Sequence, residues 1–142
     1  MLIKDNKYTV EIEDLGHSGE GVAKIDGFTI FVAQGVPGDI VEIKITLLKK
    51  NYALGEIIKI IKASESRVKP LCPLANTCGG CQVMHIDYKH QLKMKEKRVK
   101  DTLERIGKIN TELLPIIGME NPYEYRNKAQ MPVGILDGKA IL

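Results

Sequence analysis

The feature that most constrains this chain is a regular succession of short β patterns and turn residues before residue 62. Tyr8, Val10 and Ile12 alternate with polar neighbours, which is the period of a strand with one buried face. Turn chemistry stands at residues 26–27 and 36–39. The pattern predicts five strands, over residues 7–15, 22–25, 28–33, 40–48 and 52–61. Five strands joined mostly by hairpin turns favour a small closed or partly open β barrel, which removes its own edges.

A glycine-dense loop over residues 16–21 joins the first two predicted strands. Glycines there supply the positive φ angles of a hairpin or a bulge. A phosphate-binding loop is the alternative interpretation, but such a loop opens a helix, and residues 22–25 have a strand pattern. We therefore expect a turn.

Charge changes sign along the predicted barrel. Residues 1–43 carry three Lys or Arg against eight Asp or Glu, whereas residues 44–70 carry seven against two. Small barrels with a basic rim often bind single-stranded nucleic acid, and a merely solvated lysine-rich face is the alternative. Tyr52 is the favoured stacking residue, because at least one of Phe28 and Phe31 should belong to the core. The candidate RNA-binding residues are Lys44, Lys49, Lys50, Tyr52, Lys59, Lys62, Arg67 and Lys69.

The second half of the chain has a different pattern. Residues 63–70 are polar and end in a proline, which indicates a linker. A helix is predicted over about residues 87–106, with Asp87 as N-cap and Gly107 after its end. Its predicted apolar stripe comprises Tyr88, Leu92, Val99, Leu103 and Ile106. The lysines between these positions are interpreted as a solvated face or as further phosphate contacts.

The tail predicts the start of a further sheet. Residues 125–133 and 134–142 are expected to form its first hairpin, because weak alternation and a second apolar run follow a turn-prone stretch. The chain is accordingly divided into residues 1–63, the barrel, and residues 64–142, an α+β segment of linker, cysteine-rich loop, long helix and incomplete sheet. A lone hairpin is marginally stable in water, so we expect the tail to be the least stable part.

All three cysteines, Cys72, Cys78 and Cys81, lie within ten residues. Thiolates at this spacing select zinc, an iron–sulfur cluster or copper(I). A zinc site would be complete with His85 or His90 as the fourth ligand, whereas a [4Fe-4S] cluster needs four cysteines, so spacing alone slightly favours zinc. Free buried thiols and a nucleophilic cysteine are the remaining alternatives. Three cysteines make a poor disulfide framework.

The expected compartment is the cytoplasm. No apolar run approaches the roughly 20 residues that span a bilayer. The polar first seven residues do not have the composition of a signal peptide.

Several motifs, taken in order, resemble a known family: the glycine-rich loop before Val22, the turn at residues 36–39, the Ser66-Arg-Val-Lys-Pro70 segment, Cys72-x5-Cys-Gly-Gly-Cys81, and His85-x2-Tyr-x2-Gln-x3-Lys95. Together they resemble the opening of the RNA uracil-C5 methyltransferases that carry a TRAM domain and an iron–sulfur cluster, whose best-known members act on 23S ribosomal RNA. The resemblance implies an OB-like, five-stranded TRAM barrel that binds RNA. It also implies that the three cysteines are three of four [4Fe-4S] ligands, with the fourth beyond residue 142.

The resemblance further implies what these residues lack. Family members use a cysteine nucleophile, a carboxylate base and an S-adenosylmethionine domain, all in their C-terminal part. Here the three cysteines are assigned to the cluster, and no glycine-rich strand-to-helix turn follows for S-adenosylmethionine. We therefore expect the N-terminal portion of such an enzyme, inactive alone, with ribosomal RNA as its partner and no obligate protein partner.

Overall fold

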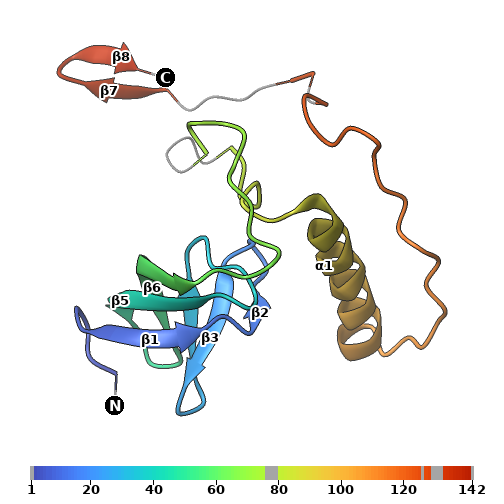
Figure 1. Cartoon of the computed structure of the whole chain (residues 1–142), viewed down its shortest axis with the longest axis horizontal. Helices are drawn as coiled ribbons and strands as arrows, with labels where there is room; N and C mark the ends of the chain where they lie inside the picture. Colours follow the sequence, from blue (N-terminus) through green and yellow to red (C-terminus); the bar gives the residue numbers. More distant parts are fainter. Residues whose placement is uncertain (1, 76–79, 126, 129–132, 142) are drawn as a thin grey trace.

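The computed structural model describes residues 2–75, 80–125, 127–128 and 133–141, and its main body is one mixed β-sheet (Figure 1). The described residues of this sheet form β1 (Lys7–Glu11), β2 (Asp14–Leu15), β3 (Gly21–Ile25), β4 (Phe28–Val32), β5 (Ile40–Leu48) and β6 (Tyr52–Lys62). Their spatial order is β1-β5-β6-β4-β3-β2. Each predicted strand is present, with the first divided into two short strands.

The described strands form one six-stranded sheet and not a closed barrel, so the closed form of the predicted five-stranded barrel is wrong. β1 pairs with β5 at one edge and β2 pairs with β3 at the other. Between them, the Ile12 N–H donates to the Asp39 carbonyl at 2.9 Å and the Glu13 N–H donates to the Val22 carbonyl at 2.8 Å. One bending segment thus supplies both edges of the sheet. β1 and β2 are consecutive in the chain, so residues 12–13 join the two edges of the sheet covalently.

The core lies on one face of this sheet and consists mainly of β-branched residues. Val41, Ile43 and Ile45 alternate along β5 and are fully buried. Others in the cluster are Val10, Ile12, Ala23, Ile30, Val32 and Ala53. Phe28 packs against this cluster while remaining partly exposed. Burial of this alternating set fixes the register of the strands, because a slip of one residue would expose it.

Parallel pairing of β4 with β6 is the main departure from a chain of hairpins. Ile30 lies opposite Ala53 and Val32 lies opposite Gly55 in this pair. Gly55 sits close to the core, because a Cβ there would come within 3.0 Å of the Ile43 Cδ1. The pairing brings together two strands that the sequence separates by β5.

The predicted helix is present as α1 (Tyr88–Asp101), which continues as a π-helical turn, η1 (Thr102–Ile106). Asp87 is its N-cap, as predicted, and its carboxylate accepts from the Lys89 and His90 N–H groups. The predicted stripe is not a buried one, since no helix residue is buried and Val99 and Ile106 are 51% and 79% exposed. No helix in the described part of the chain is long and apolar enough to cross a membrane.

The tail forms a smaller hairpin than predicted, apart from the main sheet (Figure 1). β7 (Gly134–Leu136) pairs with β8 (Lys139–Ile141) around Asp137 and Gly138, whose φ angles are 51° and 73°. The predicted strand over residues 134–142 is therefore itself a hairpin. Of the other predicted strand, Tyr125, residues 127–128 and Val133 are not extended strand, and the rest lies outside the described residues. The Asp-Gly turn determined the pairing, because it joins two three-residue strands directly.

Candidate nucleic-acid interface

A buried ion pair attaches the segment after β6 to the sheet. The Asp39 carboxylate, fully buried, accepts from Arg67 Nε at 3.0 and 3.1 Å and from its Nη2 at 2.5 Å. The same carboxylate accepts from the Val36 N–H at 2.8 Å and the Ser64 N–H at 2.9 Å. Burial alone would raise the pKa of Asp39, but these hydrogen bonds, first that from Arg67, hold it below its usual value. The predicted linker is thus a fixed connection.

Arg67, a predicted RNA-binding residue, is one partner of this ion pair. Its Nη2 also donates to the Gln34 carbonyl at 2.6 Å, and its side chain is only 16% exposed. Backbone pairing continues from this segment to residues beyond the cysteines, since the Val68 N–H donates to the His85 carbonyl and the Asp87 N–H to the Ser66 carbonyl. The segment therefore positions the start of α1 relative to the sheet.

The cysteine-rich segment is described only in part. Cys72 is half-buried and Cys81 is exposed, and both are free thiols. Cys78 lies outside the described residues. Among the residues that the structure describes, no three His, Cys, Asp or Glu side chains converge to hold a metal ion. The structure therefore does not test the predicted ligand set.

The two candidate histidine ligands have different surroundings. His85 is 7% exposed, and its Nε2 is buried with no hydrogen-bond partner in the described part of the chain. Burial, and then the charge of Arg67, lower the pKa of His85, so its imidazole is neutral near pH 7. His90 instead contacts the Asp87 carboxylate at the start of α1. His85 thus has a buried ring nitrogen without a partner among the described residues, whereas Nδ1 of His90 is engaged by Asp87.

The predicted basic residues of the sheet are partly neutralised by acidic neighbours. Lys44 Nζ lies 3.0 Å from the Asp5 carboxylate. Lys59 lies opposite Glu42 in the β5–β6 pair, but among the described residues it makes no ion pair within 4.0 Å. Across the described residues, the other predicted lysines make no ion pair within 4.0 Å; these are Lys49, Lys50, Lys62 and Lys69. Tyr52 is 37% exposed and meets Phe31 edge to face, with ring centroids 5.7 Å apart. The sheet thus presents one partly exposed aromatic ring, that of Tyr52, and several separate lysines.

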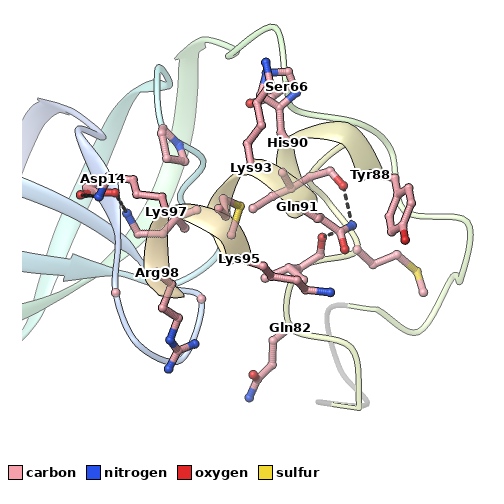
Figure 2. A pocket seen from close by; sticks show the side chains of 18 of the residues that line it. Asp14, Ser66, Gln82, Tyr88, His90, Gln91, Lys93, Lys95, Lys97 and Arg98 are labelled. Carbon is pink, nitrogen blue, oxygen red and sulfur yellow. Dashed lines mark hydrogen bonds and ion pairs between the residues drawn. The ribbon is translucent and has the colours of Figure 1, made fainter. Parts of the chain in front are cut away.

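A larger basic surface lies between the sheet and α1. It is an open groove of about 1600 Å³, walled by the β2–β3 loop, residues 62–66, residues 80–86, α1 and part of the tail (Figure 2). Its basic lining residues are His17, Lys62, Lys93, Lys95, Lys97, Arg98 and Arg105, with His90 near the helix start. Of these, only Lys62 was individually predicted to bind RNA; the helix lysines were predicted only as a group, and His90 only as a zinc ligand. The lysine-rich spacing of the helix was a usable indication, but the sequence did not show which face the β2–β3 loop would meet.

Two contacts bridge the groove from α1 to the β2–β3 region. Lys97 Nζ lies 2.9 Å from Asp14 and 3.1 Å from Asp101, as Figure 2 shows for Asp14. The hydrogen bond to Asp14 is the first cause that raises the pKa of Lys97. Partial burial raises the pKa of Asp14, but the bonds from Lys97 and the Leu15 N–H outweigh it and leave it lowered. Beside this pair, the Arg98 guanidinium contacts the His17 ring.

Tyrosines and an amide complete the groove. Tyr88, Tyr123 and Tyr125 line it, and the Tyr88 hydroxyl accepts from the Met119 N–H at 2.8 Å, which ties the tail to the helix. Gln91 Nε2 donates to the Ile86 carbonyl at 2.8 Å and the Val83 carbonyl at 3.1 Å. Aromatic faces beside unpaired cations are the combination that binds single-stranded nucleic acid.

Part of the chain matches a known domain, and nearly all of it is similar in sequence to longer proteins. Residues 6–58 match the TRAM domain. A protein of Halalkalibacterium halodurans named an uncharacterized RNA methyltransferase is 48% identical over 139 residues, which is 97% of this chain and 30% of that protein. One of the same description from Caldanaerobacter subterraneus is 51% identical over 128 residues, or 90% of this chain and 28% of that protein. The chain thus spans about 30% of the length of these curated relatives.

The chain is also similar to a solved structure. The Pyrococcus abyssi tRNA (uracil-54, C5)-methyltransferase, in complex with S-adenosyl-L-homocysteine, is 30% identical. The match covers 75% of this chain and 23% of that one, with a TM-score of 0.50.

Proposed function

This chain contains a TRAM domain and is related along nearly its whole length to proteins named RNA methyltransferases, and on that basis we propose that it is the RNA-binding portion of such an enzyme. The observation that carries the proposal is the 48% identity over 97% of the chain. The RNA would be held through its phosphates by lysines of residues 44–69 and by those lysines of α1 that line the groove.

The proposed reaction of the longer enzyme is methylation of C5 of a uracil. The motifs of the sequence and the similarity to a tRNA (uracil-54, C5)-methyltransferase support this class of base. Ribosomal RNA is the proposed substrate because the motifs resemble enzymes that act on 23S ribosomal RNA. The catalytic cysteine, the base and the S-adenosylmethionine site would belong to the rest of the longer enzyme, so we expect no methyl transfer by these 142 residues alone.

Salt dependence of RNA binding tests the proposal. A fluorescently labelled, uridine-containing single strand is titrated with the chain and followed by anisotropy. Each phosphate contact to a single strand contributes about −0.7 to the slope of log affinity against log salt, so about six contacts predict a roughly 300-fold loss between about 50 and 200 mM salt. Absence of binding at the low-salt end, or binding that salt leaves unchanged, would refute the proposal.

We also propose that Cys72, Cys78 and Cys81 hold three corners of a [4Fe-4S] cluster in the longer enzyme. Soft thiolates are the donor set such a cluster requires, and the two described thiols are not tied up in disulfides. A bound cluster would supply electron-transfer or structural chemistry; the residues of this chain would only hold and shield it.

A specific observation keeps zinc as a second candidate. The unpartnered, buried Nε2 of His85 could serve as a fourth ligand and would complete a site for a self-standing module. Anaerobic purification followed by iron, sulfide and zinc analysis decides between the two. A broad brown absorbance that Cys72→Ser abolishes supports the cluster. One zinc per chain, lost in both Cys72→Ser and His85→Ala, supports the module. A chain with neither metal contradicts the module, whereas the cluster is contradicted if the longer enzyme, purified in the same way, contains no iron and sulfide.

A further inference from the structure

We propose that one single strand of RNA lies in the groove between the β2–β3 loop and α1, and that its phosphates displace Asp14 and His17 from Lys97 and Arg98. This inference rests on the proposed RNA binding, and it commits to a surface that the basic residues of the sheet did not predict. The groove would then open when RNA binds, because the two displaced side chains are the contacts that bridge it.

The charges of the groove favour a polyanion. Its lining includes six lysines and arginines against four carboxylates, those of Glu13, Asp14, Glu65 and Asp101. Among the described residues, Lys62, Lys93 and Lys95 have no carboxylate within 4.0 Å. Figure 2 shows Lys93, Lys95 and Lys97 on α1, with Lys97 directed toward Asp14 and Lys95 toward another side of the helix. Unpaired cations at this spacing can neutralise successive phosphates, with release of counterions.

The contacts of Lys97 with Asp14 and of Arg98 with His17 can be replaced by contacts with phosphates. Lys97 and Asp14 are 55% and 53% exposed, so water and salt screen the pair and it contributes little to holding the groove closed. A phosphate offers the same charge as Asp14 with additional acceptor oxygens. Lys97 would retain Asp101, its neighbour one turn along the helix, while releasing Asp14 to the phosphate. Arg98 would likewise exchange the His17 ring for a phosphate, to which a guanidinium donates two parallel hydrogen bonds.

The aromatic lining favours a single strand over a duplex. Tyr123 and Tyr125 are 39% and 62% exposed, and both face the groove that the cations line. Unstacked bases can lie on such rings, whereas the bases of a duplex are already stacked on one another. Base stacking of this kind tolerates many sequences, so the groove would add affinity and orientation more than sequence choice.

Paired lysine variants on the same helix test the location. Lys93→Ala/Lys95→Ala removes two groove cations, and Lys89→Ala/Lys100→Ala removes two exposed lysines that do not line the groove. At about 0.1 M salt each lost phosphate contact costs about fivefold in affinity, so the groove variant should bind a labelled single strand of about ten nucleotides roughly 25-fold more weakly. Its salt slope should also fall by about 1.4, while the control changes less than about threefold.

Charge removal at Asp14 tests the displacement. Asp14→Asn should tighten RNA binding by up to about fivefold, since an exposed pair of this kind opposes the phosphate only weakly. Asp26→Asn, with the same change of charge in the distant β3–β4 turn, should leave affinity unchanged. Weaker binding by Asp14→Asn would show that the carboxylate shapes the site, and would overturn the displacement.

The outcomes separate this inference from the proposed function. If the unmodified chain binds RNA, but both lysine pairs lose affinity equally, the groove assignment is wrong and the proposed function stands. If Lys44→Ala/Lys59→Ala weakens binding while the groove pair does not, RNA lies on the sheet and the groove serves another partner, such as a protein segment. If no RNA binds at all, the proposed function itself fails. Far-UV circular dichroism of each variant confirms that it is folded.

Discussion

The Asp39–Arg67 ion pair should dominate the attachment of the second half of the chain to the sheet. Asp39→Ala removes a carboxylate that accepts from Arg67 Nε and Nη2 and from the N–H groups of Val36 and Ser64. Removing one partner of a buried pair costs about 3–5 kcal/mol. The Arg67 side chain retains 16% exposure and can be partly rehydrated, which places the expected loss near the lower end, at about 3 kcal/mol.

Urea unfolding followed by far-UV circular dichroism measures this loss, because the chain has no tryptophan to report by fluorescence. With a slope of about 1–3 kcal/mol per molar urea, the midpoint should fall by at least about 1 M. Asp5→Asn removes the charge that pairs with Lys44 at an exposed site, and asparagine tolerates the positive φ of 68° at this position, so the midpoint should stay unchanged. If Asp39→Ala behaved like this control, the ion pair would not hold the segment and the reasoning would be refuted.

Four further predictions concern the same framework. The pKa of Asp39 is held below its usual value in the folded chain, so its stabilisation should be fully present above about pH 4 and be lost as pH falls through the lowered pKa; acid unfolding of Asp39→Asn should lack that component. Ile43→Ala, at a fully buried core position, should cost about 2–5 kcal/mol in urea unfolding. Gly21→Ala should cost about 1–3 kcal/mol, because its Cβ would come within 2.8 Å of the Gly35 Cα. Tyr88→Phe should speed hydrogen exchange at the Met119 amide, which donates to the Tyr88 hydroxyl.

Local pattern was sufficient for most elements. Alternation along residues 40–48 identified β5 because side chains in a strand point to opposite faces with a period of two. Asp87 was recognised as a cap from its residue type and its place before the helical pattern. In the structure its carboxylate accepts from the N–H groups two and three residues ahead. Motifs along the chain resembled those of RNA methyltransferases, and proteins so named are similar to almost the whole of it.

Predictions that depended on distant partners fared less well. The apolar positions of α1 have helical spacing, but Val99 and Ile106 remain exposed because no described segment covers them. The tail hairpin was predicted between residues 125–133 and 134–142, but it forms within the second of these ranges. The weak alternation of the first range was taken for a strand, and the Asp-Gly turn inside the second range was not. The first predicted strand is divided into β1 and β2, which pair with β5 and β3 at opposite edges of one sheet and not with each other, so no closed five-stranded barrel forms.

By itself, then, the sequence determined the strands, the capped helix and the turns, because each is written in spacings of a few residues. The tertiary structure alone decided that β4 runs parallel to β6, that Asp39 holds a residue 28 positions away, and that Lys97 meets Asp14 from 83 positions away. Such contacts follow from how loops close and how faces pack, and neither is encoded in local periodicity. The groove that these contacts form is for this reason the one candidate site that could be seen only in the folded chain.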